Sequence, residues 1–113
     1  MEERTKNFAI RIIKAAVFLE RQTEVERILG RQLLRSGTSI GANYRESRAA
    51  QSEKDFLNKL EIALKEALET EYWIELIRES GLSKSDLFTP LAEEANELVR
   101  ILRATTKKLK SKS

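Results

Sequence analysis

Apolar side chains recur every three or four residues along most of this chain, and this period decides the fold class. A period near 3.6 residues places apolar side chains on one face of an α-helix. The sequence has only four Gly and one Pro, whereas turn-rich β folds need many more of both. We therefore predict an all-α chain, with helices at about residues 3–20, 23–50, 53–80 and 85–110.

The links between these segments are short, which decides how the helices connect. Helices joined by links of a few residues must run antiparallel to their neighbours. A chain of 113 residues is long enough to bury a core without disulfides or metals. We predict one domain over residues 1–113 that folds as an antiparallel up-and-down four-helix bundle.

Capping signals mark several of the helix ends. Thr23 and Glu26 have capping-box spacing, in which each side chain binds a free backbone N–H. Ser52 and Asp55 have the same spacing before the third segment, and Gly81 after it suits the left-handed conformation that ends many helices. These residues predict the ends of the second and third helices.

Two starts are open for the fourth helix. Ser83, Ser85 and Asp86 are residue types that favour a helix start. Pro90 suits only the first turn of a helix, which favours a start at Thr89 instead.

The first segment is apolar over more than one stripe. Ile10, Ile13 and Val17 lie beside its main stripe, so two neighbours are expected, with another subunit as one candidate. Of the adjacent Tyr72 and Trp73, we expect one in the core and one covering an interface, with base stacking as the alternative. The residues expected to face the core are Phe8, Ile12, Ala15, Ala16, Leu19, Val25, Leu29, Leu33, Ile40, Phe56, Leu60, Ala63, Ala67, Ile74, Leu91, Ala95, Leu98, Leu102 and Leu109.

The side chains that most catalytic and metal sites need are missing. There is no Cys, so disulfides, thiolate zinc sites and cysteine nucleophiles are impossible. There is no His, which removes the commonest general base and a common metal ligand. Glutamates crowd the third segment, but di-iron bundles need Glu-x-x-His pairs. We expect no enzyme activity, no catalytic residue, no cofactor and no metal.

No targeting or membrane signal is evident. No apolar run approaches the roughly 18 residues of a membrane span. The acidic start, Met1-Glu2-Glu3, does not resemble a signal peptide. We expect no membrane partner and a cytoplasmic location.

Charge is unevenly placed along the chain. Residues 1–52 carry ten Lys and Arg against six acids, and residues 81–113 carry seven against four. Residues 53–80 carry four against eight, while the whole chain has a net charge of +3. This pattern suits contacts between subunits of opposite local charge, polyanion binding or ordinary solvated helix faces.

A row of arginines is the most distinctive charged feature. Arg27, Arg31 and Arg35 follow at four-residue spacing on one helix face, and Arg45 and Arg48 extend it. Guanidinium groups bind either phosphate or carboxylate, so the arginine row has two possible interpretations. The row could contact RNA or DNA phosphates, assisted by the basic tail, or pair with glutamates of the third segment, which we slightly favour. The tail residues are Lys107, Lys108 and Lys110, and the glutamates are Glu66, Glu69 and Glu75.

Small and polar residues interrupt the second segment. A glycine in a helix interior lowers helix stability by about 1 kcal/mol relative to alanine. We therefore expect Gly37 and Gly41 to be present because they allow close contact with another helix, and the alternative interpretation is a local break in the helix. Arg35, Ser39 and Asn43 are expected to be structural, because a polar residue in a bundle core often fixes register or oligomeric state. Ser36, Ser39 and Ala42 are expected to complete a smooth patch with the glycines.

Several stretches resemble a known bacterial family. They are GRQLLRSGTSIGANYRE at residues 30–46, KDFL at 54–57 and ALKEALETEYW at 63–73. Together they resemble the four helix bundle protein family, also called the 23S rRNA-intervening sequence protein family. The chain is also similar to the accessory variability determinant of diversity-generating retroelements.

The resemblance implies a four-helix bundle that assembles into a ring-like homopentamer. The related determinant is a basic pentamer that binds nucleic acid and a reverse transcriptase. We therefore hypothesise a non-enzymatic pentamer that binds RNA or DNA weakly through basic surface. The alternative is a protein-interaction or scaffold module without a nucleic-acid role.

Overall fold

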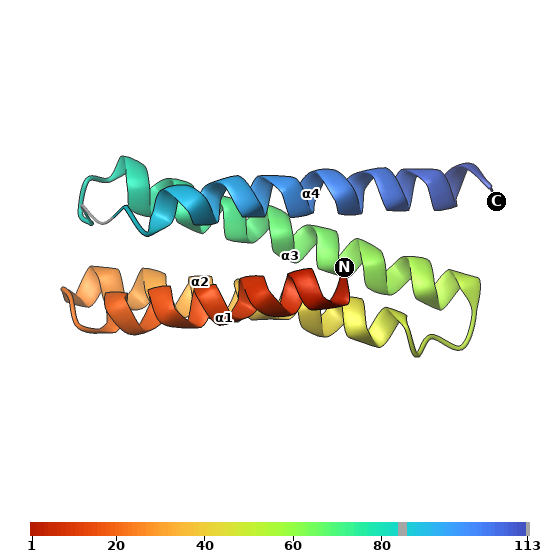
Figure 1. Cartoon of the computed structure of the whole chain (residues 1–113), viewed down its shortest axis with the longest axis horizontal. Coiled ribbons are helices and arrows are strands. Elements are labelled where there is room, and N and C mark those ends of the chain that lie inside the picture. The colour runs from red at the N-terminus through yellow and green to blue at the C-terminus, as the bar shows by residue number, and fades with distance from the viewer. Residues whose placement is uncertain (84–85, 113) are drawn as a thin grey trace.

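The computed structural model describes residues 1–83 and 86–112, which form four helices (Figure 1). The described residues contain no β-strand, so the predicted all-α class is confirmed. The helices are α1 (Glu2–Glu20), α2 (Glu24–Ser47), α3 (Glu53–Glu79) and α4 (Phe88–Ser111).

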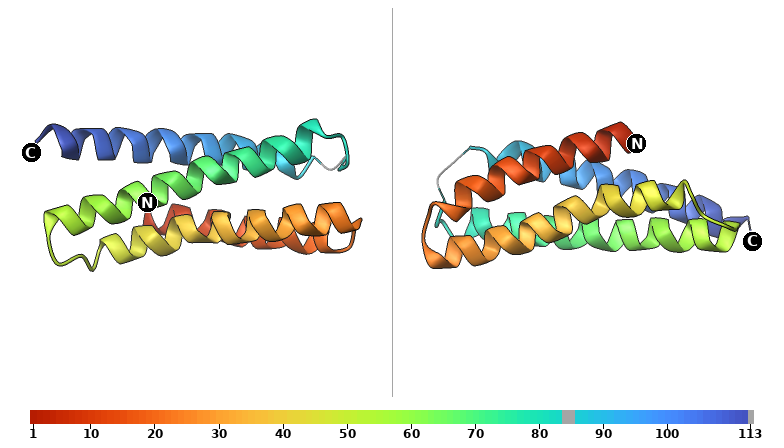
Figure 2. Two further views of the ribbon diagram at one scale, coloured as in Figure 1. Left: turned by 180° about the vertical axis from the view of Figure 1, so that it is seen from behind. Right: turned by 90° about the horizontal axis from the view of Figure 1, so that it is seen from below.

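The helices run up and down in an elongated bundle of 47 × 21 × 20 Å (Figure 2). Each helix packs on the next along the chain, while α1 and α4 meet over a much shorter stretch. Among the described residues α1 does not approach α3 closely, nor α2 α4, so each of these pairs lies on a diagonal of the bundle. The predicted four-helix bundle is confirmed.

Helix α1 is shorter than the other three, so Met1 lies partway along the bundle (Figure 1). Arg4 in its first turn forms two hydrogen bonds with Glu94 of α4, at 2.7 and 2.9 Å. Beyond this point α4 continues past the N-terminus and packs on α3 without α1 beside it (Figure 1).

The core consists of apolar stripes from all four helices, and most of the predicted inward residues belong to it. Val25 is an exception, because its side chain is 53% exposed. The neighbouring Glu26 is buried instead, because its carboxylate closes the capping box with Thr23. The buried apolar residues are Phe8, Ile12, Ala15, Leu19, Leu33, Ile40, Leu60, Ala63, Ala67, Ile74, Ile77, Phe88, Leu91, Ala95, Leu98, Val99 and Leu102.

The helix ends mostly follow the capping signals. Thr23 accepts from the Glu26 N–H at 3.3 Å, and Ser52 accepts from the Asp55 N–H at 3.1 Å. Gly81 has a φ of 71°, the left-handed conformation expected of it.

The ends without a strong capping signal differ from the expected ones. Helix α2 ends at Ser47 rather than at residue 50. Helix α4 begins at Phe88, so Pro90 lies in its first turn, and Ser85 lies outside the described residues.

Glycines let α1 and α2 approach closely, and α2 runs unbroken through them. A Cβ on Gly37 would lie 2.8 Å from two carbons of Ile12, and one on Gly30 would lie 2.9 Å from Leu19 Cβ. A Cβ on Gly41 would lie 3.2 Å from Thr5 Oγ1. The structure therefore supports close contact rather than a break.

The prediction that Ser36, Ser39 and Ala42 complete a smooth patch with the glycines is wrong. Ser36 turns to the other neighbour of α2, where the Thr70 hydroxyl of α3 donates to Ser36 Oγ at 2.9 Å. Ala42 is exposed, and Ser39 is half-buried. The patch fails because these three residues point in different directions around the helix from the glycines.

Candidate functional site

The arginine row lies on the outward side of α2, and two of its members, Arg31 and Arg35, form ion pairs with neighbouring helices. Arg35 pairs with two carboxylates of α3: Nη1 lies 3.4 Å from Glu66 Oε2, and Nη2 contacts Glu69. Arg31 Nη2 lies 2.8 Å from Glu20 Oε1 of α1. The middle of the row is therefore ion-paired within one chain.

The partners differ in part from the predicted ones. Arg27 donates to the backbone oxygen of Gln22 at 3.2 Å rather than to a carboxylate. Glu75 forms no ion pair within the described chain. The hydrogen bond from Arg31 to Glu20 raises the pKa of Arg31.

The last two arginines of α2 lie toward its C-terminal end. Arg45 Nε lies 3.5 Å from Glu2 Oε2 of α1, in a loose pair. Arg48 is exposed just after the helix and makes no ion pair with any described residue. Of the five arginines discussed for α2, Arg48 has the greatest freedom to bind an external anion.

The remaining predicted polar residues make local hydrogen bonds. Asn43 Nδ2 donates to the backbone oxygen of Ser39 at 2.8 Å, and Ser39 Oγ donates to that of Arg35 at 2.6 Å. Both side chains bond back to their own helix, which satisfies them without a partner helix. The polar bond that does join two helices is the one between Ser36 and Thr70, which the sequence did not reveal.

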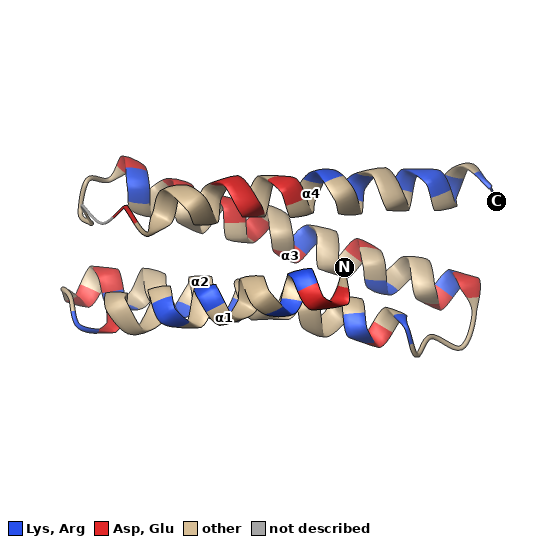
Figure 3. Cartoon of the chain, viewed as in Figure 1, with Lys and Arg blue, Asp and Glu red and all other residues tan. Residues whose placement is uncertain are grey.

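The densest basic surface is the C-terminal half of α4. No Asp or Glu follows Glu97 in the sequence. Figure 3 shows the change along α4, with acidic residues in the first half and basic residues in the second. Six exposed cations lie after Glu97, and we call them the α4 basic surface: Arg100, Arg103, Lys107, Lys108, Lys110 and Lys112.

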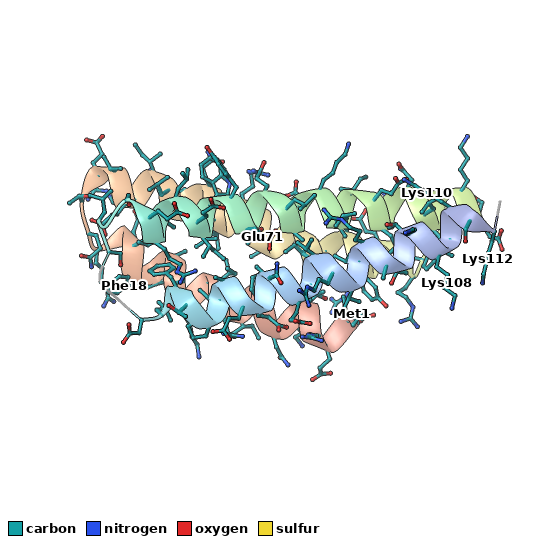
Figure 4. All side chains as sticks on the ribbon, turned by 90° about the horizontal axis from the view of Figure 1, so that it is seen from above. Met1, Phe18, Glu71, Lys108, Lys110 and Lys112 are labelled. Carbon is teal, nitrogen blue, oxygen red and sulfur yellow. The ribbon has the colours of Figure 1, made fainter. Side chains whose placement is uncertain are left out.

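Three of these six cations were predicted as binding residues, and the structure adds the others. Lys107 and Lys108 make no ion pair with described residues, whereas Lys110 Nζ lies 2.7 Å from Glu61 Oε2 of α3. Lys108, Lys110 and Lys112 gather at the end of the bundle (Figure 4). The sequence signal for the whole α4 basic surface is the lack of acidic residues after Glu97, because this signal includes the two arginines that the lysine cluster leaves out.

The geometry of this surface suits a linear polyanion. Arg100, Arg103 and Lys107 follow at spacings of three and four residues, so they share one face of α4. From Arg100 to Lys112 the helix rises about 18 Å, which matches about five base pairs of a nucleic-acid duplex. Helix α1 does not extend beside this surface (Figure 1).

A second kind of surface is apolar and exposed. Ile10, Ile13 and Val17 of α1 are 42%, 46% and 49% exposed, so the wide apolar face predicted for this helix points outward. On α3, Tyr72 is 53% exposed and stacks against the half-buried Trp73.

The described residues offer little for other chemistry. They contain no group of three or more acidic residues placed to hold a metal ion. No helix formed by the described residues is long and apolar enough to cross a membrane.

The family model described as 23S rRNA-intervening sequence protein matches residues 2–104. The chain belongs to this family. The predicted family is therefore confirmed, and Arg100 and Arg103 fall inside the matched region while the lysines of the α4 basic surface follow it.

A solved relative agrees in fold. It is the crystal structure of a protein of unknown function from the S23 ribosomal protein family of Bacteroides thetaiotaomicron VPI-5482. The two chains are 42% identical with a TM-score of 0.86, over 94% of this chain and 97% of the other. No curated protein matches the sequence.

Proposed function

We propose that this chain is a non-enzymatic module that forms a homo-oligomer, a pentamer, and binds RNA or DNA through the α4 basic surface. The observation that carries the proposal is six exposed cations in the last part of α4, with no acid after Glu97. The family resemblance supports the number of copies.

Phosphate neutralisation explains how this surface would bind. A cation that contacts a phosphate releases condensed counterions, so affinity falls as salt rises. Six contacts at most from one chain give weak binding, and several chains acting on one nucleic acid would strengthen it.

The surface favours contact with the backbone over contact with the bases. Residues 98–113 contain no aromatic side chain, so they offer no platform on which a base could stack. We therefore propose binding with little sequence preference.

The arginines of α2 take a smaller part in this proposal. Arg31 and Arg35 are held by carboxylates of the same chain, and a phosphate would have to displace Glu20, Glu66 or Glu69. Arg48, which has no such partner, is the α2 residue that adds most.

The second candidate function is a protein-interaction or scaffold module with no nucleic-acid role. The apolar side chains exposed on α1 and α3 favour it, because apolar patches of this kind mark protein contacts. The two functions are compatible if the apolar surfaces serve assembly and the α4 basic surface serves nucleic acid.

The test compares two variants that each remove four cations. One carries Arg100→Gln, Arg103→Gln, Lys107→Gln and Lys108→Gln, and the other carries Arg27→Gln, Arg31→Gln, Arg45→Gln and Arg48→Gln. Binding to labelled duplex RNA and DNA is measured by fluorescence anisotropy between about 50 and 200 mM salt.

We expect the α4 variant to lose most of the affinity and to lower the slope of log affinity against log salt by about 3. The α2 variant should lose less than about threefold, since two of its four cations, Arg31 and Arg45, are already in ion pairs. Absence of wild-type binding at the lowest salt, or equal losses in both variants, would contradict the proposed site.

A further inference from the structure

Several outward-facing side chains of α1 and α3 are apolar, which a bundle standing alone does not need. Helices that face solvent normally place polar residues opposite their buried stripe. In α1 that outward position holds Ile10 and Val17, and in α3 it holds Tyr72, all more than 40% exposed.

The first of these regions, the α1 surface, consists of Ile10, Ile13 and Val17 with Leu34 of α2. All four side chains are at least 37% exposed. A shallow groove between the two helices runs through the surface, lined by Ile13, Val17 and Leu34, with Gly30 on its wall.

The second region, the α3 surface, consists of Leu68 and Tyr72 with the half-buried Leu76. These residues recur at four-residue spacing, so they form one stripe. Leu68 is 38% exposed and Tyr72 is 53% exposed. Ile28 of α2, 52% exposed, lies near this stripe, because Arg35 pairing with Glu69 sets the antiparallel register of α2 and α3.

The two surfaces are bordered by charges of opposite balance. Next to the α1 surface, Lys6, Lys14 and Arg21 are exposed without an ion pair in the described chain, against one such acid, Glu3. Next to the α3 surface, the unpaired acids are Glu75 and Glu79, against one unpaired cation, Lys65.

We propose that the α1 surface of one copy packs on the α3 surface of the next copy, an inference that rests on the homo-oligomer of the proposed function. Opposite charge borders favour this pairing. Contact between two α1 surfaces would bring Lys14 and Arg21 against their own copies, and contact between two α3 surfaces would do the same with Glu75 and Glu79.

The positions of the surfaces determine the kind of assembly. Helices α1 and α3 lie on a diagonal, but both surfaces extend toward α2, through Leu34 and Ile28, so they point to different sides of the bundle without being directly opposite. A contact between unlike surfaces leaves each copy with one free surface of each kind, so further copies add until a ring closes. This geometry favours a ring or a chain of copies over a dimer in which two like surfaces meet.

Charge reversal on each border tests the pairing without nucleic acid present. One variant carries Lys14→Glu and Arg21→Glu, a second carries Glu75→Lys and Glu79→Lys, and a third carries all four changes. Mass in solution is measured by sedimentation and light scattering over a range of protein concentrations, with helix content and thermal unfolding as checks on folding.

Each two-residue reversal should weaken association at least tenfold, because it places like charges across the contact. The four-residue variant should return to within about threefold of the wild type, because the reversed borders match again. This rescue is the result that a merely structural role of the charges would not give.

Apolar substitutions provide a second readout. Val17→Glu and Tyr72→Glu should each shift the protein toward monomer while the helix content stays unchanged. Leu82→Glu is the matched control, because Leu82 is 47% exposed but belongs to neither surface, and it should leave the mass unchanged.

Two outcomes would overturn the proposal in different ways. If the wild type assembles and the reversed variants assemble equally well, or the four-residue variant stays dissociated, the pairing of these surfaces is wrong while the homo-oligomer stands. If the wild type is a monomer at every concentration, the homo-oligomer itself fails and the apolar surfaces belong to contact with a different protein.

Discussion

The helices of this bundle present different chemistry to the outside, and α1 and α4 differ most. Helix α1 carries exposed Ile10 and Val17 at its outermost positions, whereas α4 carries charged residues there, including Arg100. Helices α2 and α3 are mixed, because α2 exposes Ile28 beside its arginines and α3 exposes Tyr72 among charged residues. All four bury apolar stripes of a similar kind in the core, so the difference lies in the outward faces alone.

This contrast distinguishes the apolar side chains that the fold requires from those that it does not require. A stable bundle needs an apolar stripe on the inward side of each helix. Apolar side chains on the outward side of α1 and α3 add nothing to that core and cost solubility, so they point to contact with another molecule. The charged faces of α2 and α4 differ in degree, because Arg31, Arg35 and Arg45 of α2 pair with carboxylates of the same chain, whereas Lys107 and Lys108 of α4 pair with no described carboxylate.

The largest expected effect comes from two adjacent isoleucines of α1. Ile12 is 0% exposed and Ile13 is 46% exposed. Ile12→Ala should lower the free energy of unfolding by about 3 kcal/mol, because it leaves a cavity against α2. Ile13→Ala should change it by less than about 1 kcal/mol when the protein is dilute.

Urea unfolding at several protein concentrations checks both substitutions. Ile13→Ala should matter more as concentration rises, because it weakens association rather than the monomer. If the two variants lowered the free energy of unfolding by similar amounts at every concentration, the inward and outward faces of α1 would not differ as described.

A smaller effect with an informative sign is expected at Gly37. Gly37→Ala improves helix propensity by about 1 kcal/mol, yet its Cβ would crowd Ile12 at a cost of about 2 kcal/mol. The variant should therefore be less stable by about 1 kcal/mol in thermal or urea unfolding. The exposed Ala42 is the matched site on the outward side of α2, where Ala42→Gly should show the propensity loss alone.

If Gly37→Ala raised the stability instead, the close approach of α1 and α2 would not be required by the fold. That result would also weaken the distinction between the two sides of α2.

The smallest expected effect concerns the charged contact between α1 and α4. The hydrogen bond from Arg4 lowers the pKa of Glu94, although partial burial of the carboxyl opposes this shift. A lowered folded-state pKa adds stability above the ordinary glutamate pKa, and this stability is lost as pH falls through the lowered value.

Glu94→Gln should therefore cost about 0.5 kcal/mol near neutral pH and nothing in strong acid. Thermal unfolding of the variant and the wild type across this pH range is the measurement. A constant difference at all pH values would show that Glu94 acts through packing rather than through its charge.

Local features of the chain were predictable because local spacing determines them. The capping box at Thr23, the end at Gly81 and the apolar excess on α1 all follow from residue order and a period near 3.6. The outward direction of that excess needed the structure. Val25 was misplaced because the periodic pattern could not show that its neighbour Glu26 turns inward to close the cap.

Contacts between helices were predictable only in part. An arginine side chain is long enough to reach either neighbouring helix, so the sequence could not decide that Arg31 pairs with Glu20 while Arg35 pairs with Glu66. The hydrogen bond between Ser36 and Thr70 depends on the register of two helices, which periodicity leaves undetermined. The position of α1 relative to the C-terminal half of α4 likewise required the three-dimensional arrangement.

The position of the α4 basic surface at one end of a long, narrow bundle has a consequence for avidity. If copies join side by side through their flanks, every copy places its cations at the same rim of the assembly. A nucleic acid that spans several copies then gains from each contact in turn, since later contacts occur at high local concentration. Binding should thus depend steeply on nucleic-acid length, with short oligonucleotides bound poorly and longer ones retained.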